Sequence, residues 1–281
     1  MLGAICGDIL GSTNEFKDKK YSDISHIRLF HESDRITDDT ILTCAVADWL
    51  LHDIQKNYND DEALKRALAK RFVYWIKNNE PRDKAYGFRF MQWFYKADLV
   101  QEYDPINSFG NGSGMRVSPV GWFFDTLEET LRFAKISAAV THNHPEGEKG
   151  AMCIAAAVFL ARKGFDKKYI KDYLVRTFDY KKIMKDVAQI RASWEWDSTC
   201  QETVPLAVAA FLESSDFESA VRLAISFGCD SDTVACMAGA IAEAYYNSIS
   251  NEIIEFCTSR IPDTVLTVLE EFRNNISGVI T

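Results

Sequence analysis

Two short acidic clusters lie far apart in the sequence, and both contain residue types that bind hard metal ions. Residues 37–40 read TDDT, and residues 230–233 read DSDT. Carboxylate and hydroxyl oxygens suit Mg²⁺, Ca²⁺ or Mn²⁺ far better than zinc. If folding brings the two clusters together, they could hold a pair of divalent cations. The chain would then be a metal-dependent enzyme rather than a binding module.

Each cluster also permits a structural interpretation, because each directly precedes an apolar run with helical spacing. Asp and Thr are good N-cap residues, and acidic side chains in a first turn complement the helix dipole. That interpretation stays open for either cluster alone. A cap needs only one carboxylate or hydroxyl, however, whereas each cluster supplies several. Asp230 and Asp232 are two residues apart and could face one ion from a turn, and Gly228 permits a close backbone approach.

Two loops are further candidates for ligand binding. Residues 110–116 (GNGSGMR) alternate glycine with other residues, which can expose consecutive backbone N–H groups to a phosphate. Residues 141–147 (THNHPEG) hold two of the five histidines, which could bind a metal or a phosphate. The alternatives are a flexible loop and a helix-ending turn. The aromatic residues within 88–95 are expected to be mostly core, with some members free to stack on a purine.

Apolar residues recur at spacings of three and four along most of the chain, which predicts a mostly or wholly α-helical fold. Two segments, 151–161 and 234–243, are apolar nearly all round and should be central and buried. Residues 12–36 and 103–121 are polar or rich in glycine and proline, and we expect irregular, functional loops there. No linker-like stretch divides the chain, so a single domain spanning residues 1–281 is predicted. The helical segments cover residues 41–50, 64–76, 134–140, 151–161, 204–212, 220–227, 234–246 and 265–272.

The overall composition narrows the classes of function. Hydrophobic residues make up 47% of the 281 positions, so a sizeable core is possible. The net charge of −9 disfavours a broad nucleic-acid or anionic-membrane surface, although a small basic cleft remains compatible with it. No apolar run reaches the roughly 20 residues of a membrane span, and no signal peptide is evident. Seven dispersed cysteines without a CxxC pair indicate a reduced, cytoplasmic protein with buried thiols.

Five segments, taken in order, resemble the motifs of the ADP-ribosylglycohydrolase family. The resemblance extends over nearly the whole chain, since the helical stretches between and after the motifs also fit. One departure is visible: the family's common Gly-Gly-Asp stretch reads Gly228-Cys229-Asp230, which should preserve the loop and could make the site sensitive to thiol reagents. The segments are GDILGSTNE (7–15), TDDT (37–40), GNGSGMR (110–116), THNHPEG (141–147) and FGCDSDT (227–233).

The resemblance implies an all-α fold, a single compact multi-helix domain with a binuclear cleft for two Mg²⁺ or Mn²⁺ ions. It implies that Glu15 or Asp39 handles the proton in catalysis, without ranking the two. The implied metal ligands are Thr37, Asp38, Asp39, Asp230, Asp232 and Thr233. The implied substrate-binding residues are Glu15, Gly110, Asn111, Gly112, Ser113, Met115, His142 and Gly228.

The activity that the resemblance implies is metal-dependent hydrolysis of the C1″ glycosidic bond of an ADP-ribosylated protein or small molecule, releasing ADP-ribose. ADP-ribosyl-arginine is the leading substrate. Oxygen-linked adducts of serine, acetate or a nucleic-acid end are one alternative, and an inactive binding or structural relative is another. A generic metal phosphohydrolase would release AMP instead. We expect a monomer that does not act at membranes, with acceptor choice set by rim residues 16–36 and 98–109.

Overall fold

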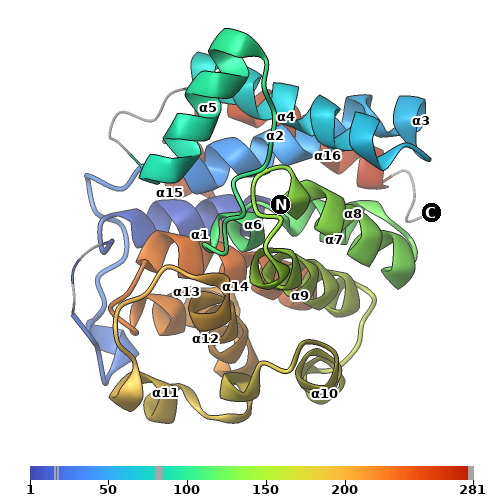
Figure 1. The fold of residues 1–281 in the computed structure, drawn as a ribbon. Coiled ribbons are helices and arrows are strands. Elements are labelled where there is room, and N and C mark those ends of the chain that lie inside the picture. Colours follow the sequence, from blue (N-terminus) through green and yellow to red (C-terminus); the bar gives the residue numbers. More distant parts are fainter. Residues whose placement is uncertain (16, 18, 80–84, 278–281) are drawn as a thin grey trace.

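The computed structural model describes residues 1–15, 17, 19–79 and 85–277, and within these ranges the fold is all-α, as predicted (Figure 1). No β-strand occurs in the described residues, where the only sheet-like pairing is an isolated bridge between Gly110 and Thr199. The helices are α1 (Leu2–Ser12), α2 (Asp38–His52), α3 (Ile54–Asn57), α4 (Asp61–Asn78), α5 (Phe88–Val100), α6 (Gly112–Met115), α7 (Ser118–Phe123), α8 (Leu127–Ala139), α9 (Pro145–Arg162), α10 (Lys167–Phe178), α11 (Val187–Ser193), α12 (Cys200–Glu213), α13 (Phe217–Ile225), α14 (Ser231–Tyr246), α15 (Asn251–Thr258) and α16 (Asp263–Ser277), with 3-10 turns η1 (Ile24–His26) and η2 (Lys181–Met184).

Helices α9 and α14 form the centre of the domain, as their all-round apolar sequences predict. Nearly every residue of α14 is buried, and it contacts α1, α9, α12 and α13. In α9, the segment 151–161 is buried except at Met152. A helix without a polar face gains most by complete burial, so these two helices form the frame on which the amphipathic outer helices pack.

Glycines allow α1 to lie directly against α14. A Cβ atom on Gly7 would lie 2.1 Å from the carbonyl oxygen of Ala235, and one on Gly11 would lie 2.5 Å from Cα of Asp232. The Ser231 hydroxyl then donates a 3.0 Å hydrogen bond to the carbonyl of Gly11. This close approach brings the end of α1 beside the first turn of α14, where the second acidic cluster lies.

One of the two predicted loops contains unexpected helix. The described residues of 13–36 are irregular apart from the short turn η1, but residues 103–121 include α6 and most of α7. Pro119 lies in the first turn of α7, where its missing N–H leaves no helical hydrogen bond unmade. The proline that favoured a loop therefore marks a helix start, and both helices are too short to show a periodic apolar pattern.

The other expectations from composition are partly tested by the structure. Among the described helices, none combines the length and the apolar character that crossing a membrane requires.

All seven cysteines are free and buried, as predicted. Burial raises the pKa of the Cys229 thiol well above its usual value, with further contributions from Asp230 and Asp232. Because thiols react as thiolates, this disfavours the expected sensitivity to thiol reagents.

Candidate metal centre and ligand cleft

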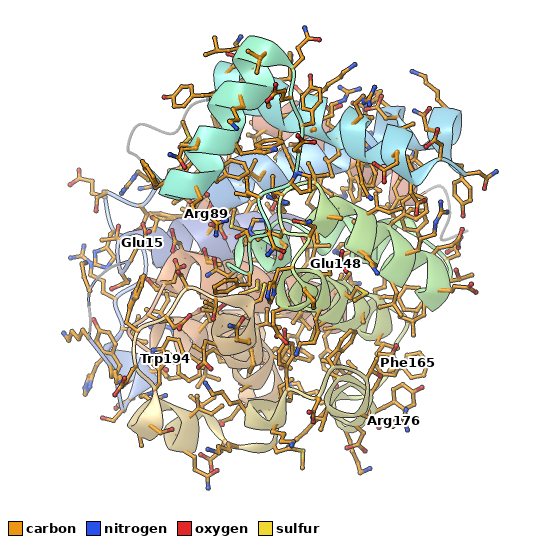
Figure 2. All side chains as sticks on the ribbon, in the orientation of Figure 1. Glu15, Arg89, Glu148, Phe165, Arg176 and Trp194 are labelled. Carbon is orange, nitrogen blue, oxygen red and sulfur yellow. The ribbon has the colours of Figure 1, made fainter. Side chains whose placement is uncertain are left out.

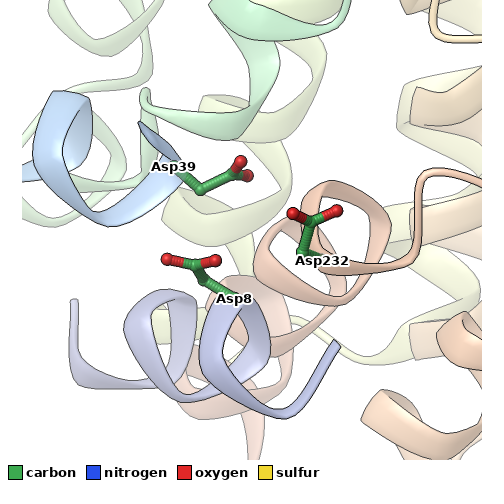
Figure 3. A group of neighbouring side chains, drawn as sticks. All are labelled: Asp8, Asp39 and Asp232. Carbon is green, nitrogen blue, oxygen red and sulfur yellow. The ribbon is translucent and has the colours of Figure 1, made fainter. Parts of the chain in front are cut away.

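Three helices bring carboxylates from distant parts of the chain to one point. Asp8 of α1, Asp39 of α2 and Asp232 of α14 point toward one another (Figure 3), and one oxygen from each lies within 4.8 Å of the others. A second group, with the same spacing, consists of Glu15, Asp230 and Asp232. The two predicted acidic clusters therefore meet, and Asp232 belongs to both groups.

Asp8 was not predicted as a site residue, and it holds the first turn of α2 in place. Its carboxylate accepts hydrogen bonds from the backbone N–H of Thr37 (3.0 Å) and of Thr40 (3.1 Å). It also accepts from both threonine hydroxyls, at 2.8 Å for Thr37. The sequence offered two signals: Asp8 lies in the family motif at 7–15, and it is a single charged residue inside an apolar run, where a buried acid needs compensating donors.

The structural interpretation of residues 37–40 is confirmed in its elements, because Thr37 is the N-cap of α2 and Asp38 and Asp39 lie in its first turn, but Thr37 alone makes the cap hydrogen bond. The Thr37 side chain caps α2 by accepting from the N–H of Asp39 at 3.3 Å. Asp39 is 1% exposed, and its Oδ2 accepts from the Thr233 hydroxyl at 3.1 Å. Its Oδ1 is buried with no hydrogen-bond partner among the described residues. The acidic side chains of this cluster are therefore left available for another ligand.

The second cluster is connected to the glycine-rich loop. Asp230 precedes α14 without making a side-chain cap bond, and its Oδ2 instead accepts from Nδ2 of Asn111 at 2.8 Å. Asp232 lies in the first turn of α14 and is 2% exposed. The loop at 110–116 and the acidic cluster thus form one continuous surface, although they are far apart in the sequence.

Burial and mutual repulsion make these carboxylates hard to ionise in the absence of a cation. Burial, and then the neighbouring carboxylates, raise the pKa of Asp38, Asp39 and Asp232 well above the usual value. Burial, followed by repulsion from Asp230, raises the pKa of Glu15 to about 7. Burial also raises the pKa of Asp8 to about 6, against the lowering effect of its four hydrogen bonds.

The donor set fits hard divalent cations. All the available donors are carboxylate or hydroxyl oxygens, the ligands of Mg²⁺ and Mn²⁺. Clustered buried acids are costly unless a positive charge compensates them, and the unpartnered Oδ1 of Asp39 lacks such compensation. The acidic groups could therefore hold metal. The residues in a position to contribute are Asp8, Glu15, Asp38, Asp39, Asp230, Asp232 and Thr233.

The acidic groups open into a cleft of about 430 Å³, which lies within the size range of small-molecule sites. The cleft also has aromatic and cationic lining, part of which comes from the candidate segments 88–95 and 110–116 although none of these residues was predicted individually as a site residue. Phe88 and Arg89 of α5 belong to it, together with Trp196 and the buried Arg116; Figure 2 labels Glu15 and Arg89. The predicted residues that line the cleft are Glu15, Asp38, Asp39, Gly110, Asn111, Gly112, Met115, His142, Asp230, Asp232 and Thr233.

Three predicted site residues lie behind the lining. Thr37 is buried under the first turn of α2. Ser113 is buried, and its hydroxyl donates to the carbonyl of Gly147 at 2.7 Å, which joins the two predicted ligand loops. Gly228 has a φ of +63°, and a Cβ there would lie 2.6 Å from the backbone of Lys19. These residues shape the site from outside it.

The rim of the cleft also differs from expectation. Ile106 and Ser108 from the predicted segment 98–109 line it, whereas none of the described residues of 16–36 does. Two further segments also contribute to the lining, through Ala85, Gly87, Phe88, Arg89, Phe90, Trp196 and Ser198. Of the aromatic residues within 88–95, Trp93 and Phe94 are in the core, while Phe88 is exposed at the cleft. Acceptor recognition is therefore expected to involve α5 rather than the loop after α1.

Asp8 gives a stability prediction. Replacing Asp8 with alanine leaves four buried donors without their acceptor, so the free energy of unfolding should fall by about 3 kcal/mol or more. Asp60→Ala is the matched control, because Asp60 caps α4 from an exposed position, and its loss should cost only about 1 kcal/mol. Urea denaturation of both variants in Mg²⁺ measures the difference. Equal losses would show that the buried hydrogen bonds of Asp8 stabilise the fold no more than an exposed helix cap does.

Comparisons with known proteins agree with the geometry. A family model described as ADP-ribosylglycohydrolase matches residues 1–276. The chain is 27% identical to ADP-ribosylhydrolase ARH3 of Homo sapiens, with 88% of this chain and 84% of that protein covered. It is also 27% identical to the ADP-ribosylarginine hydrolase Tri1 of Pseudomonas putida, covering 88% of this chain and 69% of Tri1.

A solved structure shares the fold. The chain superimposes on an "ADP-ribosylglycohydrolase-related protein complex" with a TM-score of 0.68 and 21% identity, covering 98% of this chain and 95% of the other. At that identity the likeness concerns the fold, whereas the family match spans nearly the entire sequence. From the meeting of the motifs in one cleft and from this match, we conclude that the chain belongs to the ADP-ribosylglycohydrolase family.

Proposed function

We propose that the protein is a metal-dependent hydrolase that cleaves the C1″ glycosidic bond of ADP-ribosylated substrates and releases ADP-ribose. The leading substrate is ADP-ribosyl-arginine, the linkage named for the relative Tri1. The observation that carries the proposal is the pair of carboxylate groups sharing Asp232 in the cleft. Such a paired oxygen site suits two Mg²⁺ or Mn²⁺ ions, and an inactive relative would have no need to keep so costly a cluster.

The rest of the cleft suits the other parts of ADP-ribose. Asn111 and Gly112 lie beside the acidic site, and their loop approaches His142. Arg89 and Arg116 supply positive charge in an otherwise acidic protein, as a diphosphate would require. Phe88 and Trp196 offer aromatic surface to a base. The cleft therefore combines features for a hydroxyl-rich sugar, an anionic linker and a planar ring.

Between the two candidates for proton transfer, Glu15 fits better than Asp39. Asp39 is buried, and its Oδ2 is already engaged by the hydroxyl of Thr233. Glu15 is partly exposed and lines the cleft from the irregular segment after α1, where a substrate or water can reach it. When bound, the metal ions would supply Lewis acidity and positive charge to this region. The carboxylates orient the ribose, and positioning should provide much of the rate enhancement.

Product release from a substrate panel tests the proposal. The protein would be incubated with ADP-ribosyl-arginine, an ADP-ribosyl-serine peptide and O-acetyl-ADP-ribose, each in Mg²⁺ or in EDTA, and products would be identified by mass. We expect free ADP-ribose from ADP-ribosyl-arginine, and only in Mg²⁺. Release from an oxygen-linked substrate alone would move the assignment to that linkage.

Two other outcomes would overturn the proposed reaction. AMP in place of ADP-ribose would show cleavage of the diphosphate, as expected for a phosphohydrolase. No release from any substrate, by a protein that is folded and binds Mg²⁺, would favour a binding or structural role. Circular dichroism and Mg²⁺ titration by calorimetry supply those two controls.

A further inference from the structure

We infer that Arg116 and Thr141 fix the tautomer of His142, so that the ring presents its Nε2–H as a hydrogen-bond donor to the ligand in the cleft. The identity of that ligand rests on the proposed function. The tautomer itself follows from the hydrogen bonds of the protein alone. Thr141 would act as a positioning residue, because it influences the ligand only through His142, whereas Arg116 also lines the cleft.

The chain of hydrogen bonds begins at Arg116, which lines the cleft and is fully buried. Its guanidinium lies over the ring of Phe72, 4.4 Å from the ring centre. Its Nη2 lies 2.8 Å from the hydroxyl oxygen of Thr141. Because a guanidinium can only donate, the Thr141 oxygen must accept this hydrogen bond.

The same hydroxyl oxygen lies 2.7 Å from Nδ1 of His142. Thr141 has one hydroxyl proton, and no other acceptor for it is found among the described residues. The proton is therefore donated to Nδ1, which must then be unprotonated. In a neutral imidazole the remaining proton lies on Nε2.

The other protonation states of His142 fit this environment poorly. An Nδ1–H would give the Thr141 oxygen a second donor and leave the threonine's own proton without an acceptor. A doubly protonated ring would add a second positive charge close to Arg116. Burial, followed by the charges of Arg116 and Arg89, lowers the pKa of His142 well below its usual value. The backbone of Thr141 and His142 is also fixed, because both of these residues donate their N–H to the carbonyl of Ala138 near the end of α8.

The Nε2 edge of the ring faces the glycine-rich loop. A Cβ on Gly112 would lie 3.1 Å from Nε2, and one on Gly110 would lie 3.8 Å from it. Both glycines and His142 line the cleft, and no described residue forms a hydrogen bond with Nε2. The absence of side chains at 110 and 112 leaves this donor open. The partner that suits it is an acceptor oxygen, from a phosphate or a ribose hydroxyl, held over the loop.

Nitrogen-15 NMR of the histidine side chains tests the tautomer in the ligand-free protein. In the wild type we expect His142 Nδ1 to resonate as an unprotonated nitrogen and Nε2 as a protonated one, with His142→Asn identifying the signals. In Thr141→Val both nitrogens should move toward averaged values, and Thr141→Ser should restore the wild-type spectrum. Arg116→Met should resemble Thr141→Val, because the hydroxyl loses the donor that orients it.

Calorimetry with ADP-ribose in Mg²⁺ tests whether the donor is used. Thr141→Val should raise the Kd about tenfold, or about 1.4 kcal/mol, and Thr141→Ser should not. Thr203→Val is the matched control, because Thr203 is equally buried and donates within α12. A wild-type Nδ1–H tautomer, or an unchanged spectrum or Kd in Thr141→Val, would overturn the inference. If ADP-ribose does not bind the wild type, the proposed function fails, and the ligand-free spectra still decide the tautomer.

Discussion

Replacing Asp232 with asparagine is expected to lower kcat/KM for ADP-ribose release by roughly 1,000-fold or more, which corresponds to about 4 kcal/mol of transition-state stabilisation. Asp232 is the only residue common to both acidic groups in the described structure. Its loss should weaken metal binding on both sides at once. Asparagine preserves the size of the side chain and an oxygen acceptor, so the first turn of α14 should stay intact.

The same variant separates a functional role from a structural one. Asp166→Asn is the matched control, since Asp166 caps α10 from an exposed position and asparagine caps equally well. Activity should remain in the control and be lost in Asp232→Asn. Without metal, the Asp232 variant should melt at a higher temperature than the wild type, because one member of the buried, mutually repelling acid cluster has been removed. Full activity with unchanged metal dependence would show that Asp232 only stabilises the N-terminus of α14 through the helix dipole.

Removing the metal is expected to abolish activity and to make stability fall as the pH rises. In the metal-free fold the pKa values of Asp8 and Glu15 are raised to about 6 and about 7. Between the unfolded and the folded pKa values, the native state then binds more protons than the unfolded chain. The free energy of unfolding therefore decreases as the pH rises. The decrease should begin near the unfolded values, around pH 4, and end once the folded pKa values are passed.

Denaturation of the EDTA-treated protein at pH 5 and pH 8 measures this effect. The free energy of unfolding should be lower at pH 8, by about 3 kcal/mol in order of magnitude. Mg²⁺ should restore most of the loss at pH 8 and should change little at pH 5, where the acids are largely protonated. In Asp232→Asn the restoration should be much weaker. Equal stability at both pH values without metal would show that the carboxylates do not repel one another as the geometry requires.

The parts of the site that the sequence could predict are those whose residues are close together in the chain. Residues 37–40 and 230–233 each place several oxygen donors in one turn, so their capacity to bind a hard divalent cation can be predicted from the sequence alone. Their meeting in space is borne out by the structure. Helices α9 and α14 were equally predictable, because an apolar sequence on all sides leaves only the centre of the domain as a stable location.

The parts that could not be predicted depend on single residues placed by tertiary contacts. Asp8 is one acid in an apolar run, and nothing near it in the sequence reveals the four donors that it binds. Phe88, Arg89 and Trp196 become cleft residues only because their segments fold over the loop at 110–116. The sequence does not reveal that Gly7 and Gly11 are needed for close helix packing, because this need arises only from the contact with α14. Roles assigned through the family motifs, such as metal ligation by Thr37, stay predictions.

The packing of α1 on α14 has a consequence for the synthesis of the protein. Ribosomes make α1 before α14, so the surface that accepts the glycines of α1 emerges only after all the helices between the two have been translated. Contacts between such distant segments slow folding, and a nascent chain must keep this apolar helix from other partners meanwhile. A polypeptide interrupted before residue 231 would lack Asp232 and could complete neither of the two acidic groups.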